Sequence, residues 1–245
     1  MIPRLFCAGS LAIGQEVALP EGPARHARDV LRLGTGDRVT LLNGLGGEYA
    51  ARLAEVTKKE VRATVLDFSR REAESPYPIT VAQSMASGDK MDWIVEKSVE
   101  LGASAIVPLA AARSVLRLSP ERAAKRLDHW RAIAQSACEQ CGRNRLPTVA
   151  PVAQLDHWLA NLHGRPGLKL MLSPVHTTAF TSLPVPAPGI PVTILIGPEA
   201  GLTDAEEAQA VAAGFVPVLL GPRVMRTETA ALAALAAIHA RWGDF

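Results

Sequence analysis

One feature restricts the fold of this chain more than any other: from residue 79 onward, strand-length apolar runs alternate with segments of helical periodicity. Strands that alternate with helices are typical of an α/β layer structure. We therefore expect an α/β domain in this part of the chain, with strands at residues 79–83, 105–109, 168–172, 192–196 and 215–220.

Four helices are expected among these strands. Residues 91–101 repeat apolar side chains on one face, and residues 119–141 begin with a Ser-Pro pair that is typical of a helix start. Thr203 and Glu206 have the spacing of a capping box, which predicts a third helix. The last helix, residues 228–242, is apolar on nearly every side, so we expect it to be buried within the fold or within a dimer.

The first 70 residues have a different pattern, small and mostly β. Runs rich in β-branched or alternating apolar residues are separated by Asn-Gly and Gly-Gly turn signals, and one helical piece interrupts them at residues 22–33. A charged, proline-containing connector follows at residues 69–78. Connectors of this kind mark domain boundaries, so we expect two domains, residues 1–72 and residues 73–245.

The positive charge of the chain is small but rich in arginine. The net charge is +2, and 20 of the 26 basic residues are arginine. Guanidinium groups suit bidentate contacts with phosphate and stacking on bases, yet a GC-rich genome would also favour arginine codons. Composition alone therefore leaves RNA binding an open alternative.

The sequence lacks the features that would indicate a membrane segment, a disulfide framework or a metal site. It has no run of 18 uncharged apolar residues and no basic, then apolar, N-terminal segment, so no membrane association is expected. Three cysteines are too few for a disulfide framework, which favours a cytoplasmic protein. Cys138 and Cys141 have the spacing of half a zinc site, but no second pair completes it, so we expect packing and no metal.

Two similar segments are the candidates for chemistry. Residues 192–203 run from an apolar strand into a Gly-Pro-Glu-Ala-Gly turn, and residues 218–230 run from another apolar strand into a second Gly-Pro turn. Open α/β sheets bind ligands beyond the carboxyl ends of their strands, although each segment alone also fits an ordinary strand-to-helix turn. Backbone amides and apolar walls would suit an adenine ring and a thioether. No phosphate loop and no Gly-x-Gly-x-x-Gly motif supports nucleotide hydrolysis or dinucleotide redox chemistry.

The chain resembles a known family over nearly its whole length, the bacterial small-subunit (16S) rRNA uridine-N3 methyltransferases of the SPOUT class. The similarity rests on residues 26–32 (HARDVLR), residues 90–102 with their Glu-Leu-Gly ending, Glu139-Gln140 followed by Arg143 and Pro147, Gly197-Pro198-Glu199-x-Gly201, and Gly221-x-Arg223-x-x-Arg226-Thr227-Glu228-Thr229-Ala230. Three positions depart from the pattern: Ala200 is usually glycine, Met225 usually leucine, and Cys141 usually small and polar.

The resemblance implies a fold and an activity. The fold would be a PUA-like β-barrel followed by a trefoil-knotted α/β domain that binds S-adenosyl-L-methionine (SAM). The protein would be a homodimer with each pocket close to the partner subunit. It would methylate N3 of one uridine of 16S rRNA, within the assembled small ribosomal subunit. Alternatives are a SPOUT methyltransferase for another RNA such as tRNA, and a non-enzymatic RNA-binding factor in ribosome assembly.

The resemblance also implies site residues. SAM would be surrounded by Leu172, Ser173, Ile196, Gly197, Gly201, Leu220, Gly221, Val224, Met225 and Arg226. Arg226 would stabilise the anionic uracil, and Glu199 or Glu228 would accept the N3 proton if burial raised its pKa. A glutamate in the first turn of a helix, such as Glu228, is equally well explained by the favourable interaction of its negative charge with the positive end of the helix dipole.

For RNA placement we expect a path of cations along the phosphates. Each of these cations is also readily explained as a solvated surface charge. The residues are Arg4, Arg25, Arg28, Arg32, Lys90, Arg143 and Arg145.

Overall fold

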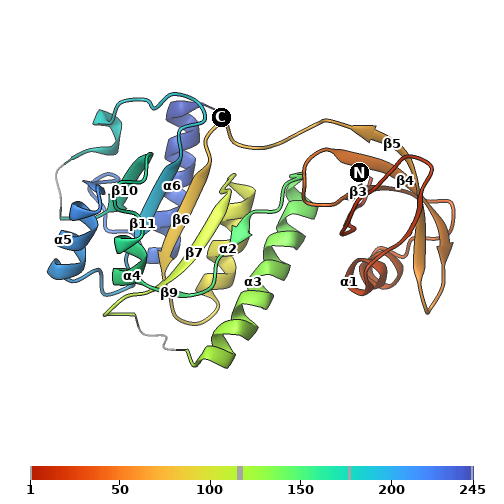
Figure 1. Cartoon of the computed structure of the whole chain (residues 1–245), viewed down its shortest axis with the longest axis horizontal. Coiled ribbons are helices and arrows are strands. Elements are labelled where there is room, and N and C mark those ends of the chain that lie inside the picture. Colours follow the sequence, from red (N-terminus) through yellow and green to blue (C-terminus); the bar gives the residue numbers. More distant parts are fainter. Residues whose placement is uncertain (1, 115–117, 176–177, 244) are drawn as a thin grey trace. The chain divides into compact units, whose positions relative to one another are not determined.

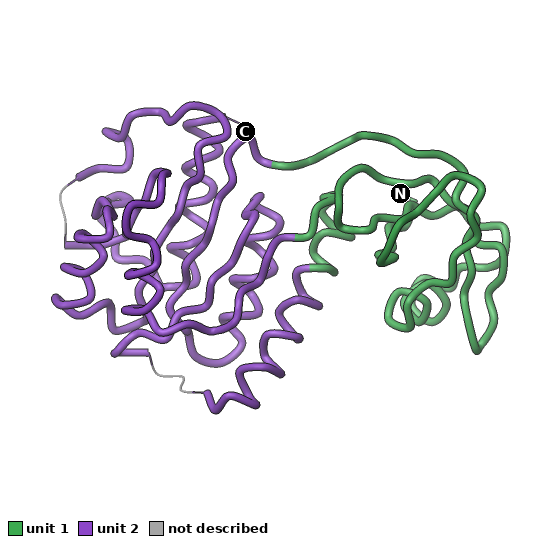
Figure 2. The backbone as a smooth tube through the Cα atoms, in the orientation of Figure 1, with its two compact units in different colours: residues 1–74, 135–146 green, residues 75–134, 147–245 purple. Residues whose placement is uncertain are grey.

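The structure, a computed structural model, describes residues 2–114, 118–175, 178–243 and 245. The chain forms two compact units, shown in separate colours in Figure 2. Unit 1 contains the chain up to Glu74 together with residues 135–146, and unit 2 contains residues 75–134 and 147–245. Residues 135–146 fall in the range that the sequence assigned to the second domain, so unit 1 is built from two separate stretches of chain.

Unit 1 is organised around a five-stranded sheet (Figure 1). The strand order is β1 (Arg4–Phe6), β3 (Arg38–Leu42), β4 (Glu48–Val56), β5 (Val61–Ser69) and β2 (Glu16–Ala18). Strand β1 pairs with β3 in parallel and the other pairs are antiparallel. Alternate residues of β5 point inward, as the period-2 pattern requires, and they pack with Leu5, Leu41 and Leu53 in one buried cluster. The helical piece consists of α1 (Glu21–Arg25) and a π-helix (His26–Val30).

The stretch 135–146 is joined to unit 1 by polar side chains. Glu139 Oε1 accepts a 2.8 Å hydrogen bond from the backbone N–H of Phe6 in β1. The side-chain amide of Asn144 donates to Arg71 O at 2.6 Å. Arg143, only 3% exposed, donates from Nε to Glu74 Oε1 at 3.1 Å. Because these partners are distant in sequence, no local pattern could have assigned this stretch to the first unit.

Unit 2 contains a parallel sheet in its described part, which confirms the predicted α/β class. The strand order is β12 (Val216–Val218), β10 (Leu168–Leu172), β11 (Val192–Ile196), β6 (Ile79–Ser84), β7 (Ala105–Ala110) and β8 (Thr148–Val149), and β9 (Ala153–Gln154) also pairs with β7. Strands β10 and β11 have the predicted bounds. The sequence missed β8 and β9 because two residues are too few for a recognisable period.

Helices lie against this sheet (Figure 1). Helices α4 (Leu155–Ala160) and α5 (Asp204–Ala212) pack together, and α2 (Lys90–Glu100) and α6 (Thr227–Trp242) pack together behind the strands in the view of Figure 1. Helix α3 (Pro120–Cys141) ends in unit 1. The predicted capping box of α5 is confirmed, since Thr203 Oγ1 accepts from the Glu206 N–H and the Glu206 carboxylate accepts from the Thr203 N–H. Among the described helices, none is both long and apolar enough to cross a membrane.

Candidate functional site

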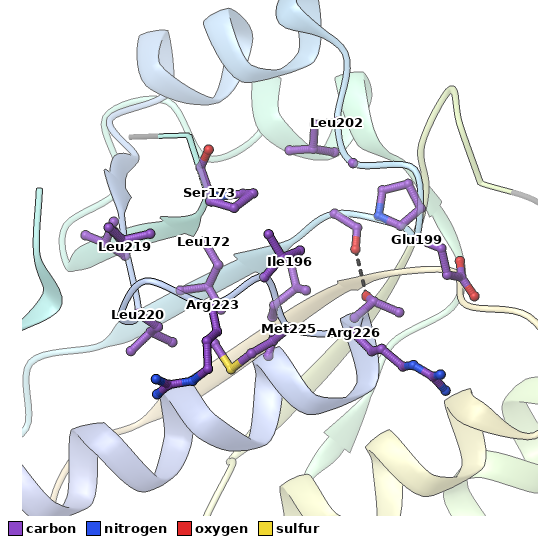
Figure 3. Close-up of a pocket in the computed structure, with 18 of the residues that line it drawn as sticks. Leu172, Ser173, Ile196, Glu199, Leu202, Leu219, Leu220, Arg223, Met225 and Arg226 are labelled. Carbon is purple, nitrogen blue, oxygen red and sulfur yellow. Dashed lines mark hydrogen bonds between the residues drawn. The ribbon is translucent and has the colours of Figure 1, made fainter. Parts of the chain in front are cut away.

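A cavity of about 470 Å³ lies at the carboxyl ends of β10, β11 and β12, inside unit 2 (Figure 3). This edge is where parallel α/β sheets bind ligands, and the volume is within the range of small-molecule sites, roughly 300–1,000 Å³. Nine of the ten residues that the sequence assigned to a cofactor line it, and Gly221 lies outside the lining. The nine are Leu172, Ser173, Ile196, Gly197, Gly201, Leu220, Val224, Met225 and Arg226.

The wall formed by the Gly-Pro-Glu-Ala-Gly turn depends on two glycines. A Cβ atom at Gly197 would lie 3.1 Å from the backbone nitrogen of Leu202, closer than most real Cβ contacts. Gly201 has a φ of +73°, in the left-handed region where a side chain is disfavoured. The turn therefore requires glycine at both positions to bring its backbone to the cavity.

Thr227, the first residue of α6, connects this turn to the neighbouring strand. Its hydroxyl donates to Gly197 O at 2.7 Å, the dashed line in Figure 3, and accepts from Gln83 Nε2 at 2.8 Å. Gln83 lies in β6 and is fully buried, and Thr227 is only 5% exposed. One threonine hydroxyl thus joins the start of α6 to the ends of β6 and β11.

Glu199 is held on the other side of the same turn. Its Oε1 accepts from the Ser87 N–H at 3.1 Å, from Ser87 Oγ at 2.9 Å and from Lys90 Nζ at 3.1 Å. Desolvation raises the pKa of this carboxyl, but the hydrogen bonds from Ser87, its own N–H and Lys90 outweigh it and lower the pKa to about 2. The condition under which Glu199 was expected to accept the N3 proton, a raised pKa, is therefore not met, and a carboxylate this acidic is a poor proton acceptor.

Lys90 contacts both of the glutamates that the sequence singled out. Its Nζ lies 3.5 Å from Glu228 Oε2 as well as 3.1 Å from Glu199 Oε1. The hydrogen bond to Glu199 is the main reason that the pKa of Lys90 is raised, so this ammonium stays charged. Lys90 and Glu199 line the cavity, whereas Glu228, in the first turn of α6, lies just outside the lining.

Besides Lys90, Glu199 and Thr227, the cavity is lined by the polar side chains of Ser173, Glu207, Arg223 and Arg226. Arg223 and Arg226 extend to opposite sides of Met225 in Figure 3. Ser173 is only 3% exposed, and its hydroxyl oxygen has no hydrogen-bond partner among the described residues. A buried hydroxyl without a partner is costly unless a ligand satisfies it. The apolar side chains of Leu172, Ile196 and Leu220, with this one unsatisfied hydroxyl, fit an adenine and a thioether better than a triphosphate.

Most cations that the sequence proposed for RNA have partners within their own unit. Arg4 pairs with Glu48 and Asn144. Arg145 lies 3.4 Å from Glu72, and Arg143 is the buried partner of Glu74 described above. Intramolecular partners explain these three arginines without RNA.

Three further arginines lie on or beside the π-helix of unit 1. Arg28 pairs with Asp29 and also donates to the Thr57 and Lys58 carbonyls. Arg25 and Arg32 are exposed, and Arg32 has a φ of 55°, the one positive value among the non-glycine residues of the described chain. Non-glycine residues in this conformation are uncommon, and π-helical turns are frequent at functional sites.

The thiol of Cys138 is buried. Burial is the main reason that its pKa is raised to about 12, and its Sγ donates to Arg145 O at 3.6 Å. Within the described residues, no group of three or more His, Cys, Asp and Glu side chains is placed to hold a metal ion.

Comparison with known proteins agrees with this geometry. A family model described as an RNA methyltransferase domain matches residues 73–239, and one described as an RNA methyltransferase PUA domain matches residues 19–66. This chain belongs to the RNA methyltransferase family. The predicted resemblance is confirmed at this level, and so is the PUA character of the N-terminal region.

Named relatives of this RNA methyltransferase cover nearly its whole length. It is 34% identical to ribosomal RNA small subunit methyltransferase E of Bacillus subtilis, over 87% of this chain and 85% of that protein. A crystal structure of ribosomal RNA small subunit methyltransferase E from Neisseria gonorrhoeae bound to SAM is 41% identical, with a TM-score of 0.92 and full coverage of both chains. A methyltransferase structure from Legionella pneumophila in complex with SAM is 36% identical, with a TM-score of 0.95 and full coverage of both chains.

Several residues of the site of this RNA methyltransferase were not predicted from its sequence. Arg223, Pro198 and Leu202 line the cavity, and Thr227 fixes its edge. All except Leu202 belong to the motifs that carry the family resemblance, so the motifs could have suggested them. Ser87 and Gln83 lie outside every motif, and their roles depend on which strand ends meet.

Proposed function

We propose that this RNA methyltransferase uses SAM to methylate N3 of a uridine in small-subunit ribosomal RNA. The observation that carries the proposal is the cavity at the ends of β10, β11 and β12, whose walls come from the segments that follow these three strands and from Lys90 of α2. The names of the relatives, and the SAM in two structures of similar proteins, support the choice of cofactor and RNA.

In this proposal the cavity holds SAM mainly through shape and backbone. Leu172, Ile196, Leu220 and Met225 supply apolar walls, and Ser173 supplies a hydroxyl that has no other partner among the described residues. Gly197, Gly201, Gly221 and Val224 belong to the two turns that enclose it. SAM supplies an electrophilic methyl group when bound.

The remaining residues act on the uridine. A uracil N3 must lose its proton before it can accept a methyl group, and the base must leave its stack at a cost of a few kcal/mol. Arg226, at the edge of the cavity, is proposed to stabilise the resulting anion. Of the two glutamates, Glu228 is now the better candidate for proton acceptor, because the pKa of Glu199 is lowered to about 2. Lys90 would hold both carboxylates in place.

The N-terminal domain, residues 1–72, is proposed to bind the RNA, and residues 73–245 to carry out the methyl transfer. Arg25 and Arg32 are the first candidates for phosphate contacts, because they are exposed and neither forms an ion pair within the part of the chain that the structure describes. Arg28 can take part only if it leaves Asp29. The homodimer, the trefoil knot and the assembled small subunit as substrate remain predictions of the same proposal.

The test is transfer of labelled methyl from SAM to small subunits from a strain that lacks this protein, with the product nucleoside identified by mass spectrometry. Label in N3-methyluridine is the expected result. Label in another nucleoside would contradict the N3 assignment. No transfer with SAM binding intact would point to another RNA, such as tRNA, and no binding at all would favour a non-enzymatic assembly factor.

A further inference from the structure

Arg113, an exposed residue that follows β7, contacts the turn that forms one wall of the cavity. Its Nη1 donates to Ala200 O at 3.2 Å and to Leu202 O at 3.1 Å. These two carbonyls stand on either side of Gly201. One guanidinium nitrogen carries two hydrogens, so it can hold both carbonyls at once.

The peptide groups of these carbonyls are also held at their N–H ends. The Gly201 N–H donates to Pro198 O at 2.8 Å, and the Thr203 N–H donates to Glu206 Oε2 at 2.8 Å. Because the C=O and N–H of one peptide group lie in one plane, both peptide groups are fixed at two points. The peptide group between them, from Gly201 to Leu202, is therefore fixed as well.

A second contact ties the same two segments together. The Ala112 N–H donates to Glu206 Oε1 at 2.7 Å, so the carboxylate that caps α5 also binds the residue before Arg113. The connection after β7 thus holds the turn through both a side chain and the backbone. Arg113 itself lies outside the residues that line the cavity, whereas Gly201 and Leu202 are among those that do.

We propose that Arg113 is a positioning residue for the cofactor site, which fixes the Gly201–Leu202 peptide group in the conformation that binds SAM. Glycine loses the most backbone freedom when it is ordered. A contact that orders Gly201 before SAM binds reduces the backbone entropy that is lost on binding, and SAM therefore binds more tightly. This inference rests on the proposed function, because it takes SAM to be the ligand.

The test compares Arg113→Ala and Arg113→Lys with Arg122→Ala, a control at an exposed arginine of α3 in the same unit. Calorimetric titration should give a Kd for SAM about 10-fold higher in Arg113→Ala, the factor that corresponds to ordering the backbone of one residue. The KM for SAM should rise in parallel, while kcat at saturating SAM stays within about 2-fold of wild type. Arg113→Lys should be intermediate, because an ammonium lacks the planar fork.

Amide hydrogen exchange supplies a readout that needs no SAM. The Gly201 N–H should exchange faster in Arg113→Ala than in Arg122→Ala, with the melting temperatures of the two variants alike. Equal SAM affinity in these two variants, or unchanged exchange at Gly201, would overturn the inference while leaving the proposed function intact. Failure of the wild-type protein to bind SAM would overturn the proposed function, and the inference with it.

Discussion

The Thr227 hydroxyl and the Gly197 carbonyl, 30 residues apart in the chain, are joined by a 2.7 Å hydrogen bond at the edge of the cavity. The same hydroxyl accepts from the buried Gln83 side chain. Loss of the hydroxyl would leave both the carbonyl and the amide without this partner, and unsatisfied buried polar groups are costly. This one atom therefore connects the stability of unit 2 with the shape of its binding site.

Replacing Thr227 by valine should lower the free energy of unfolding by about 1–3 kcal/mol, because the variant keeps the shape but loses the hydroxyl. We also expect weaker SAM binding, since Gly197 lines the cavity. Urea unfolding and calorimetric titration measure the two effects. Thr227→Ser keeps the hydroxyl and serves as the control. A valine variant that behaves like the serine variant would show that the hydrogen bond is unimportant.

Glu199 should make unit 2 sensitive to acid. Its pKa is about 2 in the folded protein and 4.5 ordinarily. A carboxylate with a lowered folded-state pKa contributes stability above its unfolded pKa and loses it as the pH falls through the folded value. Between pH 4.5 and pH 2, wild type should therefore lose about 1–2 kcal/mol more free energy of unfolding than Glu199→Gln, after allowance for solvent screening at this partly exposed group. Urea titrations at several pH values test this, and parallel curves for the two proteins would contradict it.

The two glutamates should differ in catalysis. Glu228→Gln is expected to slow single-turnover methyl transfer by about 100-fold, the typical contribution of a general base. Glu199→Gln should keep a near-normal rate and pH–rate profile, because its carboxylate accepts hydrogen bonds from Ser87 and Lys90. If Glu228 only makes a favourable interaction with the dipole of α6, Glu228→Gln will lose less than about 1 kcal/mol of folding stability, and its rate of methyl transfer will not change. Near-normal rates in both variants would end the carboxylate-base hypothesis.

The arginines of unit 1 should fall into two classes. Arg25→Gln and Arg32→Gln are expected to weaken RNA binding and to flatten its salt dependence by about one unit of slope for each phosphate that the variant no longer neutralises. Arg143→Gln should instead destabilise the protein by about 3–5 kcal/mol, because it leaves the partly buried Glu74 carboxylate without its partner. Filter binding across a salt series and thermal unfolding separate these outcomes. An unchanged salt slope in Arg25→Gln would remove that residue from the RNA surface.

The local structure near the cavity was largely predictable. Strands β10 and β11 have the predicted bounds, and the capping box of Thr203 and Glu206 is present. Hydrophobic period and capping geometry depend on residues only a few positions apart, so one sequence contains the information they need. The resemblance added the set of cofactor residues, of which the structure brings nine of ten together around the cavity.

The electrostatic state of the site was not predictable in the same way. The sequence left open whether burial would raise the pKa of Glu199 enough for it to accept a proton. Desolvation does raise this pKa, but hydrogen bonds that include those from Ser87 and Lys90 outweigh it. Ser87 lies in the connection between β6 and α2, and Lys90 is the first residue of α2. Both are more than 100 residues away from Glu199 in the chain. A pKa depends on every charge and hydrogen bond around the group, and these are known only once the strands are in order.

The sequence by itself thus determined the α/β class, the two glycine turns and the start of α5, since each follows from local periodicity and from the conformational freedom of glycine. Only the tertiary structure decided which charged side chains pair with one another. It buried Arg143 against Glu74, joined residues 135–146 to unit 1, and set Thr227 between Gln83 and Gly197. The physical reason is that hydrogen bonds and ion pairs act over a few ångströms in space, without regard to separation along the chain.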